Sequence, residues 1–256
     1  MSDPTTPSSP PPGLIAPILA GDVRAAARLM RDVDDRRPAA LAALKELHAH
    51  TGRAYVLGVT GNPGAGKSTV VDALITHYRA AGARVGVVAV DPTSPFTGGA
   101  ILGDRIRMQR HALDDGVFIR SLATPGGQGA IAERLETLIQ VVEAFGFEVI
   151  VVETVGAGQG DTAVHSLADV VLLLLQPESG DDLQFEKAGL LEVADVVAVH
   201  KADLPGAEFT AAQVRSMLDL ARESKTPVLQ VSSKARQGVA ELWQAIQSLP
   251  LRRAVV

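Results

Sequence analysis

The chain of 256 residues contains no cysteine, which excludes disulfide bonds, cysteine-based zinc sites and thiolate catalysis. Aromatic residues make up only 4% of the sequence and the formal net charge is −5, so nothing favours nucleic-acid binding through base stacking or a basic surface. No apolar run reaches the length of a membrane span, and the N-terminus lacks the basic segment and apolar core of a secretory signal. We therefore expect a cytoplasmic protein that binds neither nucleic acid nor membranes.

Short apolar runs alternate with amphipathic segments from Ala54 onward. Most of the runs have no polar face, which is typical of central strands in a parallel sheet that helices cover on both sides. The sequence therefore predicts an α/β fold with a doubly wound, mostly parallel sheet. The expected strands are Ala54–Thr60, Val85–Asp91, Val117–Ser121, Val149–Glu153, Val170–Leu175, Val196–His200 and Val228–Val231. The expected helices are Lys67–Ala81, Ile101–His111, Ile131–Phe145, Leu183–Leu191, Ala211–Glu223 and Val239–Ser248.

The N-terminal part has a different composition. Residues 1–13 are rich in proline, serine and threonine, which predicts a disordered tail. Residues 14–53 predict a small helical extension, with helices over Leu14–Ala20, Val23–Val33 and Ala39–Thr51. Pro38 suits a helix start. Residues 54–256 then form the main domain.

A phosphate-binding loop follows the first expected strand. Residues 61–68 read Gly-Asn-Pro-Gly-Ala-Gly-Lys-Ser, and an expected helix follows them, which is the context that this loop requires. Its glycines let backbone N–H groups and the positive end of the helix dipole face an anion. Lys67 would reach the β- and γ-phosphates, and the Ser68 hydroxyl would ligate Mg²⁺. These features predict a P-loop NTPase that binds a nucleoside di- or triphosphate through Gly61, Asn62, Pro63, Gly64, Ala65, Gly66, Lys67, Ser68 and Thr69.

Acidic residues follow or end other expected strands. Asp91 ends one strand, where it could orient a water molecule or reach Mg²⁺ through water, although a plain strand-to-turn aspartate before proline is an equal alternative. Asp104 follows a glycine-rich stretch and either serves the Mg²⁺ site or complements a helix dipole. Glu153 occupies the Walker-B position after the most apolar strand, and Gly156 would let a backbone N–H approach the γ-phosphate.

Two further segments point to guanine. Residues 200–203 read His-Lys-Ala-Asp, where GTPases carry Asn-Lys-x-Asp to read the base; Lys201 and Asp203 fit, and His200 replaces the asparagine. A histidine can donate one hydrogen bond in its place but does not match an amide. Ser232, Ser233 and Lys234 follow the last expected strand, where GTPases carry Ser-Ala-Lys against the guanine carbonyl.

Taken with these motifs, the chain resembles the MeaB/ArgK-type GTPases, the auxiliary proteins of methylmalonyl-CoA mutase within the SIMIBI class of P-loop proteins. The resemblance covers the chain from about Leu14 to its end, and its most specific parts are Gly-Gly-Ala-Ile-Leu-Gly-Asp and Glu-Thr-Val-Gly. The matching stretches are 20–22, 35–38, 50–53, the phosphate loop, 90–94, 98–108, 152–156, 180–184 and 194–195.

The resemblance implies a homodimeric GTPase that binds GTP, GDP and Mg²⁺. Such a protein gates adenosylcobalamin loading into an acyl-CoA mutase, and protects or reactivates that enzyme. Lys67, Ser68, Asp91, Asp104 and Glu153 would then form the phosphate and Mg²⁺ site, with Asp91 orienting water. Residues 180–187 would form a mobile switch, and Lys187 would reach a phosphate.

Three other functions fit a P-loop protein. One is a nucleotide-driven metallochaperone, although the absence of cysteine and the scattered histidines weigh against it. Another is a kinase for a small molecule or protein, although nothing in the sequence forms a separate substrate pocket with its own base. The last is an interaction module that does not hydrolyse nucleotide, which the intact lysine, serine and acidic positions disfavour.

Overall fold

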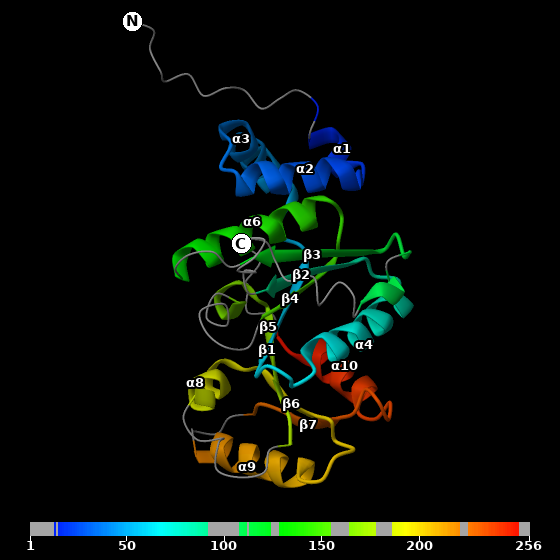
Figure 1. Cartoon of the computed structure of the whole chain (residues 1–256), viewed down its shortest axis with the longest axis vertical. Coiled ribbons are helices and arrows are strands. Elements are labelled where there is room, and N and C mark those ends of the chain that lie inside the picture. Colours follow the sequence, from blue (N-terminus) through cyan, green and yellow to red (C-terminus); the bar gives the residue numbers. More distant parts are fainter. Residues whose placement is uncertain are drawn as a thin grey trace, which may run out of the picture.

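A computed structural model provides the structure of the chain, and it describes residues 13, 15–91, 108–111, 113–123, 128–154, 164–177, 186–220 and 225–250. The centre is a sheet of parallel strands in the order β3-β2-β4-β1-β5-β6-β7 (Figure 1). The strands are β1 (Tyr55–Gly61), β2 (Val85–Asp91), β3 (Val117–Ala123), β4 (Val149–Glu153), β5 (Val170–Leu175), β6 (Val196–His200) and β7 (Val228–Val231). The chain belongs to the predicted α/β class.

The strand order creates a switch point at β1. From β1 the chain runs to β2 and β3 on one side of the sheet, and after β4 it crosses to β5, β6 and β7 on the other side. Ligands of doubly wound folds bind beyond the carboxyl ends of the strands at such a point. The carboxyl ends of β1, β4, β5, β6 and β7 therefore lie at one edge of the sheet.

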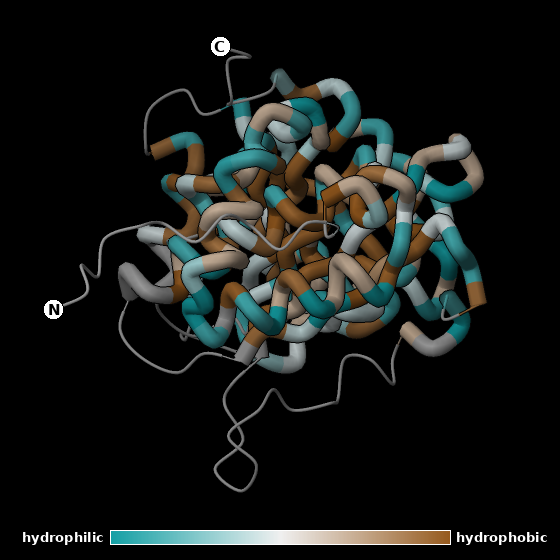
Figure 2. The backbone as a smooth tube through the Cα atoms, turned by 90° about the horizontal axis from the view of Figure 1, so that it is seen from above, coloured by the Kyte–Doolittle hydropathy of each residue, from teal (hydrophilic) through white to brown (hydrophobic). Residues whose placement is uncertain are grey.

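Helices cover both faces because successive strand residues point to opposite sides. Leu57 and Val59 of β1 face α4 (Lys67–Ala80) and α10 (Val239–Ser248), whereas Val56 faces α6 (Gln128–Ala144). Farther along the sheet, Leu173 and Leu175 of β5 pack against α8 (Glu186–Val193) and α9 (Ala207–Leu220). Figure 2 shows the hydrophobic segments gathered in the interior.

The N-terminal helices rest on the outer side of α6 (Figure 1). They are α1 (Ile15–Leu19), α2 (Val23–Asp34) and α3 (Pro38–Leu47), followed by the 3-10 turn η1 (His48–His50). Asp22 caps α2 by accepting hydrogen bonds from the N–H groups of Arg24 and Ala25 at 2.8 and 3.1 Å. Pro38 begins α3 as expected, but the α-helix ends at Leu47 rather than Thr51.

Several expectations fall wholly or partly outside the described residues. The tail over residues 1–13 does so apart from Gly13, and so does the helix over Ile101–His111 apart from its last four residues. There the structure has a 3-10 turn, η2 (Gln109–His111), in place of the end of an α-helix. Within the described part of the chain, no helix is both long and apolar enough to cross a membrane.

Carboxylates secure the opposite, amino-terminal edge of the sheet. Glu143 on α6 accepts the N–H of Ala54 at 2.7 Å, and Asp169 accepts the N–H of Val56 at 2.7 Å. Asp195 does the same for the second residue of β5, also at 2.7 Å. A buried N–H left without an acceptor is costly, so these acids have a structural role. This explains Asp195, one of the residues that carry the family resemblance.

Candidate functional site

The phosphate loop connects the end of β1 to the start of α4. Gly61 and Gly66 have φ values of 135° and 90°, in the left-handed region that side chains other than glycine rarely adopt. A Cβ atom at Gly61 would lie 2.0 Å from the carbonyl oxygen of Leu174 on β5. Both the backbone conformation and this close approach therefore require glycine. The tip of the loop, Pro63 and Gly64, is exposed.

Lys67 and Ser68 open α4 from buried positions, at 7% and 3% exposure. The Lys67 ammonium donates hydrogen bonds to the carbonyl oxygens of Gly61 and Asn62, at 2.7 and 3.1 Å, so it lies against the loop that it follows. Thr69 is exposed in the same turn, and its N–H donates to Gly66 at 3.1 Å. The first turn of the helix thus presents a cation and N–H groups toward the loop.

The carboxylate of Glu153 contacts the hydroxyl of Ser68, which lies in the first turn of α4. Glu153 is the last residue of β4, which pairs with β1, and it is 4% exposed. The Ser68 hydroxyl donates a hydrogen bond of 2.7 Å to Glu153 Oε1. A hydroxyl oxygen and a carboxylate oxygen therefore lie side by side at the carboxyl edge, directly beside the phosphate loop.

His200 connects the phosphate loop to the loop after β7. It ends β6 and is 5% exposed. Its Nδ1 lies 2.8 Å from the carbonyl oxygen of Ala65, and its Nε2 lies 3.1 Å from the hydroxyl oxygen of Ser233. Burial lowers the pKa of the His200 imidazole, an effect that the contact with the Ala65 carbonyl opposes.

Asp203 is held by a serine of the neighbouring loop. Ser232 donates a hydrogen bond of 2.6 Å from its hydroxyl to Asp203 Oδ1 and accepts one of 3.1 Å from the N–H of Ala235. The bond from Ser232 lowers the pKa of the Asp203 carboxyl, with a further contribution from the nearby Lys234 charge. Lys234 itself is exposed. The carboxylate is therefore oriented and ionised.

Comparison with known proteins agrees with this geometry. The family described as Methylmalonyl Co-A mutase-associated GTPase MeaB matches residues 26–252. The chain belongs to the MeaB family. A relative from Pyrococcus horikoshii is 47% identical over 240 residues, which cover 91% of this chain and 76% of that protein. The GTPase ArgK of Escherichia coli is 38% identical over 239 residues, covering 88% and 72% of the two chains.

A solved structure also resembles the fold. The crystal structure of a LAO/AO transport system kinase superposes with a TM-score of 0.70 at 30% identity, covering 91% of this chain and 72% of that one. The membership of the MeaB family makes the chain a P-loop GTPase that binds guanine nucleotide, as the sequence predicted.

Other predicted site residues are only partly placed in this MeaB-family structure. Asp91 is the last residue of β2 and pairs in register with Ala123, but the structure describes nothing of its side chain. Lys187 lies in α8, and again its side chain is not described. Asp104 and Gly156 lie outside the described residues.

Gln176 is a site residue that sequence reasoning missed. Its side-chain oxygen accepts a hydrogen bond of 2.8 Å from the Lys201 ammonium, and Lys201 has the unusual φ of 58°. Gln176 directly follows the buried strand β5, so it stands at the same edge as the other loops. The available signal was a polar residue immediately after a continuous apolar strand.

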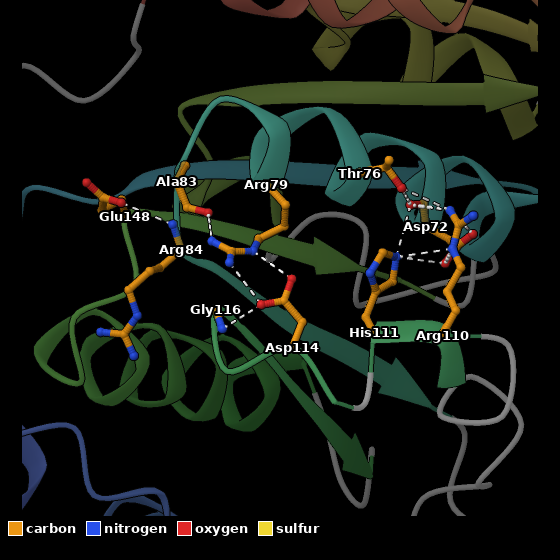
Figure 3. A network of polar contacts seen from close by, with 10 residues as sticks. All are labelled: Asp72, Thr76, Arg79, Ala83, Arg84, Arg110, His111, Asp114, Gly116 and Glu148. Carbon is orange, nitrogen blue, oxygen red and sulfur yellow. Dashed lines mark hydrogen bonds and ion pairs between the residues drawn. The ribbon is translucent and has the colours of Figure 1, made fainter.

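A second contact network ties η2 to α4 (Figure 3). Asp72, one turn after Ser68, accepts a hydrogen bond of 2.6 Å from Arg110 Nε, and its carboxylate lies 3.0 Å from His111 Nε2. Arg110 also donates to the backbone oxygen of Asp72 at 2.8 Å and to the hydroxyl of Thr76 at 3.1 Å. The turn that precedes β3 is thus anchored to the helix that carries the phosphate-loop lysine.

Proposed function

We propose that this MeaB-family GTPase is a chaperone of an adenosylcobalamin-dependent acyl-CoA mutase. It would gate cofactor loading and protect or reactivate the mutase, acting as a homodimer in the cytoplasm. The observation that carries the proposal is the family match over residues 26–252, which spans the phosphate loop, the Walker-B strand and both base-contacting segments. Methylmalonyl-CoA mutase, named in the family description, is the first partner to test.

The phosphates of GTP bind to residues 61–69 in this proposal. Backbone N–H groups of the loop and the dipole of α4 face the anion, and Lys67 contacts the β- and γ-phosphates. The buried position of the lysine and its hydrogen bonds to the carbonyl oxygens of Gly61 and Asn62 support this role, because they keep the ammonium beside the loop.

The residues present fit a Mg²⁺ ion. Mg²⁺ prefers oxygen ligands, and Ser68 Oγ and Glu153 Oε1 lie 2.7 Å apart, both buried beside the phosphate loop. Ser68 would ligate the ion, Glu153 would hold it directly or through water, and Asp91 and Asp104 would complete the site. When bound, Mg²⁺ neutralises charge on the β- and γ-phosphates.

Guanine is read by the loops after β6 and β7. The ionised Asp203 carboxylate accepts from the guanine N1–H and exocyclic amine, and the Lys201 stem packs against the purine ring. Ser232, Ser233 and Lys234 contact the guanine carbonyl, with Ser232 also holding Asp203 in position. His200 takes the place of the usual asparagine.

Hydrolysis needs an oriented water molecule. Asp91 orients this water, which attacks the γ-phosphorus while the bond to the β–γ bridging oxygen breaks, giving GDP and phosphate. Gly156 allows a backbone N–H to approach the γ-phosphate, and Lys187 reaches a phosphate from the segment that couples nucleotide to partner. We expect slow turnover alone, because full charge stabilisation awaits rearrangement by the mutase.

The experiment is GTP turnover with and without a cobalamin-dependent acyl-CoA mutase from the same source, with ATP run in parallel. Stimulation of GTP but not ATP hydrolysis supports both the base assignment and the partner class. An absence of stimulation would contradict the mutase as the partner. Phosphate transfer to a small molecule in place of water would favour the kinase alternative, and metal-dependent nucleotide turnover coupled to metal delivery would favour the metallochaperone.

A further inference from the structure

The imidazole of His200 touches two loops that are far apart in the sequence. It reaches the phosphate loop through Ala65, which is 135 residues away, and the loop after β7 through Ser233, which is 33 residues away. One of these loops belongs to the phosphate part of the site, and the other to the base part. A single buried side chain therefore spans the two halves of the nucleotide site.

The contacts determine which ring nitrogen carries the proton. A carbonyl oxygen only accepts hydrogen bonds, so Nδ1, at 2.8 Å from the Ala65 oxygen, must be the donor. In a neutral imidazole the other nitrogen is then an acceptor. Nε2 matches this role, since the Ser233 hydroxyl lies at 3.1 Å and the Ser233 N–H points to it at 3.5 Å. Every contact agrees with one tautomer.

The ring also fills the space behind the phosphate loop. A Cβ atom added to Gly66 would lie 2.3 Å from Nδ1 and 2.5 Å from Cε1 of His200. The loop backbone therefore packs directly on the imidazole, and the position of the ring limits where the loop can lie. Because the side chain is buried between β6 and the two loops, it has little room to adopt another rotamer.

We propose that His200, as the neutral Nδ1–H tautomer, is a positioning residue that fixes the phosphate loop relative to the loop of residues 232–234. It would do so with a donor toward Ala65 and an acceptor toward Ser233, the two roles that an asparagine amide would otherwise divide between its nitrogen and its oxygen. The consequence for guanine-nucleotide affinity rests on the function proposed above; the tautomer and the contacts with the two loops do not.

Protonation of Nε2 would remove the acceptor that His200 offers to Ser233. Burial opposes a positive charge on the imidazole and is the largest influence on its pKa. Among the charged neighbours, Lys201 lowers this pKa and Asp203 raises it. Nε2 thus keeps its lone pair for Ser233.

The decisive measurement is the tautomer in the nucleotide-free protein. Long-range ¹H–¹⁵N NMR spectra separate Nδ1–H from Nε2–H imidazoles, and the signal that disappears in His200→Asn identifies this ring among the six histidines of the chain. We expect a neutral Nδ1–H ring at neutral pH. A neutral Nε2–H ring, or an imidazolium, would overturn the proposal, and this holds whether or not any nucleotide binds.

Affinity for GDP tests the positioning role with two variants of matched size. His200→Asn retains a donor and an acceptor, whereas His200→Leu fills similar space with neither. We expect affinity near that of the wild type for the first and roughly 10- to 30-fold weaker binding for the second, from the loss of two hydrogen bonds. Wild-type affinity in His200→Leu would reduce the role to packing and refute the proposal.

Ser233→Ala supplies the partner in a double-mutant cycle with His200→Leu. If the two residues act through one contact, the loss of GDP affinity in the double variant is smaller than the sum of the two single losses, the remainder being the guanine contact that the proposed function assigns to Ser233. Fully additive losses would contradict the contact. Selectivity for guanine is measured separately with a variant of Asp203. Failure of the proposed function is therefore distinguishable from failure of the positioning role of His200.

Discussion

Replacing Asp203 with asparagine tests the proposed reading of guanine most directly. Ser232 holds one oxygen of the carboxylate at 2.6 Å, and its own hydroxyl is fixed as an acceptor for the N–H of Ala235. The orientation of the side chain is therefore set by the protein, and the amide of the variant can keep its oxygen toward Ser232. Its NH₂ group then faces the two donors of guanine.

The expected loss follows from the hydrogen bonds exchanged. Two hydrogen bonds from guanine to a charged acceptor contribute about 1.5–3 kcal/mol each, and at most one neutral bond of about 1 kcal/mol replaces them. The net loss is about 3 kcal/mol, which corresponds to roughly 100-fold weaker GTP binding. ATP offers no matching pair of donors at this position, so its affinity should change little.

Calorimetric titration of GTP and ATP into wild type and Asp203→Asn measures the selectivity. Asp219→Asn is the matched control, since it makes the same chemical change at an exposed position near the end of α9. Xanthosine triphosphate adds a gain-of-binding arm, because xanthine carries a carbonyl where guanine carries its amine and can accept from the new amide. Unchanged GTP over ATP selectivity would refute the base assignment.

Three further changes have defined outcomes. Lys67→Ala removes the ammonium that lies on the phosphate loop, and calorimetry should detect no tight GTP or GDP binding while circular dichroism remains native. Glu143→Leu leaves the buried N–H of Ala54 and the partly buried N–H of Arg53 without their acceptor, and urea unfolding should show a loss of about 2 kcal/mol; an unchanged midpoint would contradict that role. His200 has a lowered pKa in the folded protein, so the unfolded chain binds the extra proton and stability falls as pH drops below about 6.5. The free energy of unfolding of the wild type should therefore fall relative to that of His200→Asn as the pH drops from about 8 to about 5.5. A constant difference between the two proteins would refute the buried neutral state.

The sheet was predictable because its strands are continuous apolar runs bounded by polar residues. The expected bounds of β2, β4, β5, β6 and β7 match the structure to the residue, as do those of α10. Helix starts were less well predicted, since α9 begins at Ala207 rather than Ala211 and α6 at Gln128 rather than Ile131. In α9 the first turn carries the exposed Glu208 and Phe209 and is positioned by Gly206 at a φ of 89°, so apolar periodicity does not reveal it.

Motif spacing identified the strand ends at the site but not the contacts between them. The pattern at residues 200–203 marked His200 as a departure from the GTPase sequence. When the two motifs are compared position by position, the histidine simply lacks the asparagine amide. In three dimensions the longer imidazole reaches Ala65 with one nitrogen and Ser233 with the other, so both contacts are made by a different functional group. These two contacts are possible because β1, β6 and β7 end at the same edge of the sheet, where the ring at the end of β6 touches both loops. A substitution in a motif is therefore judged by the hydrogen bonds that its neighbours require, and here the neighbours require one donor and one acceptor, which a neutral imidazole supplies.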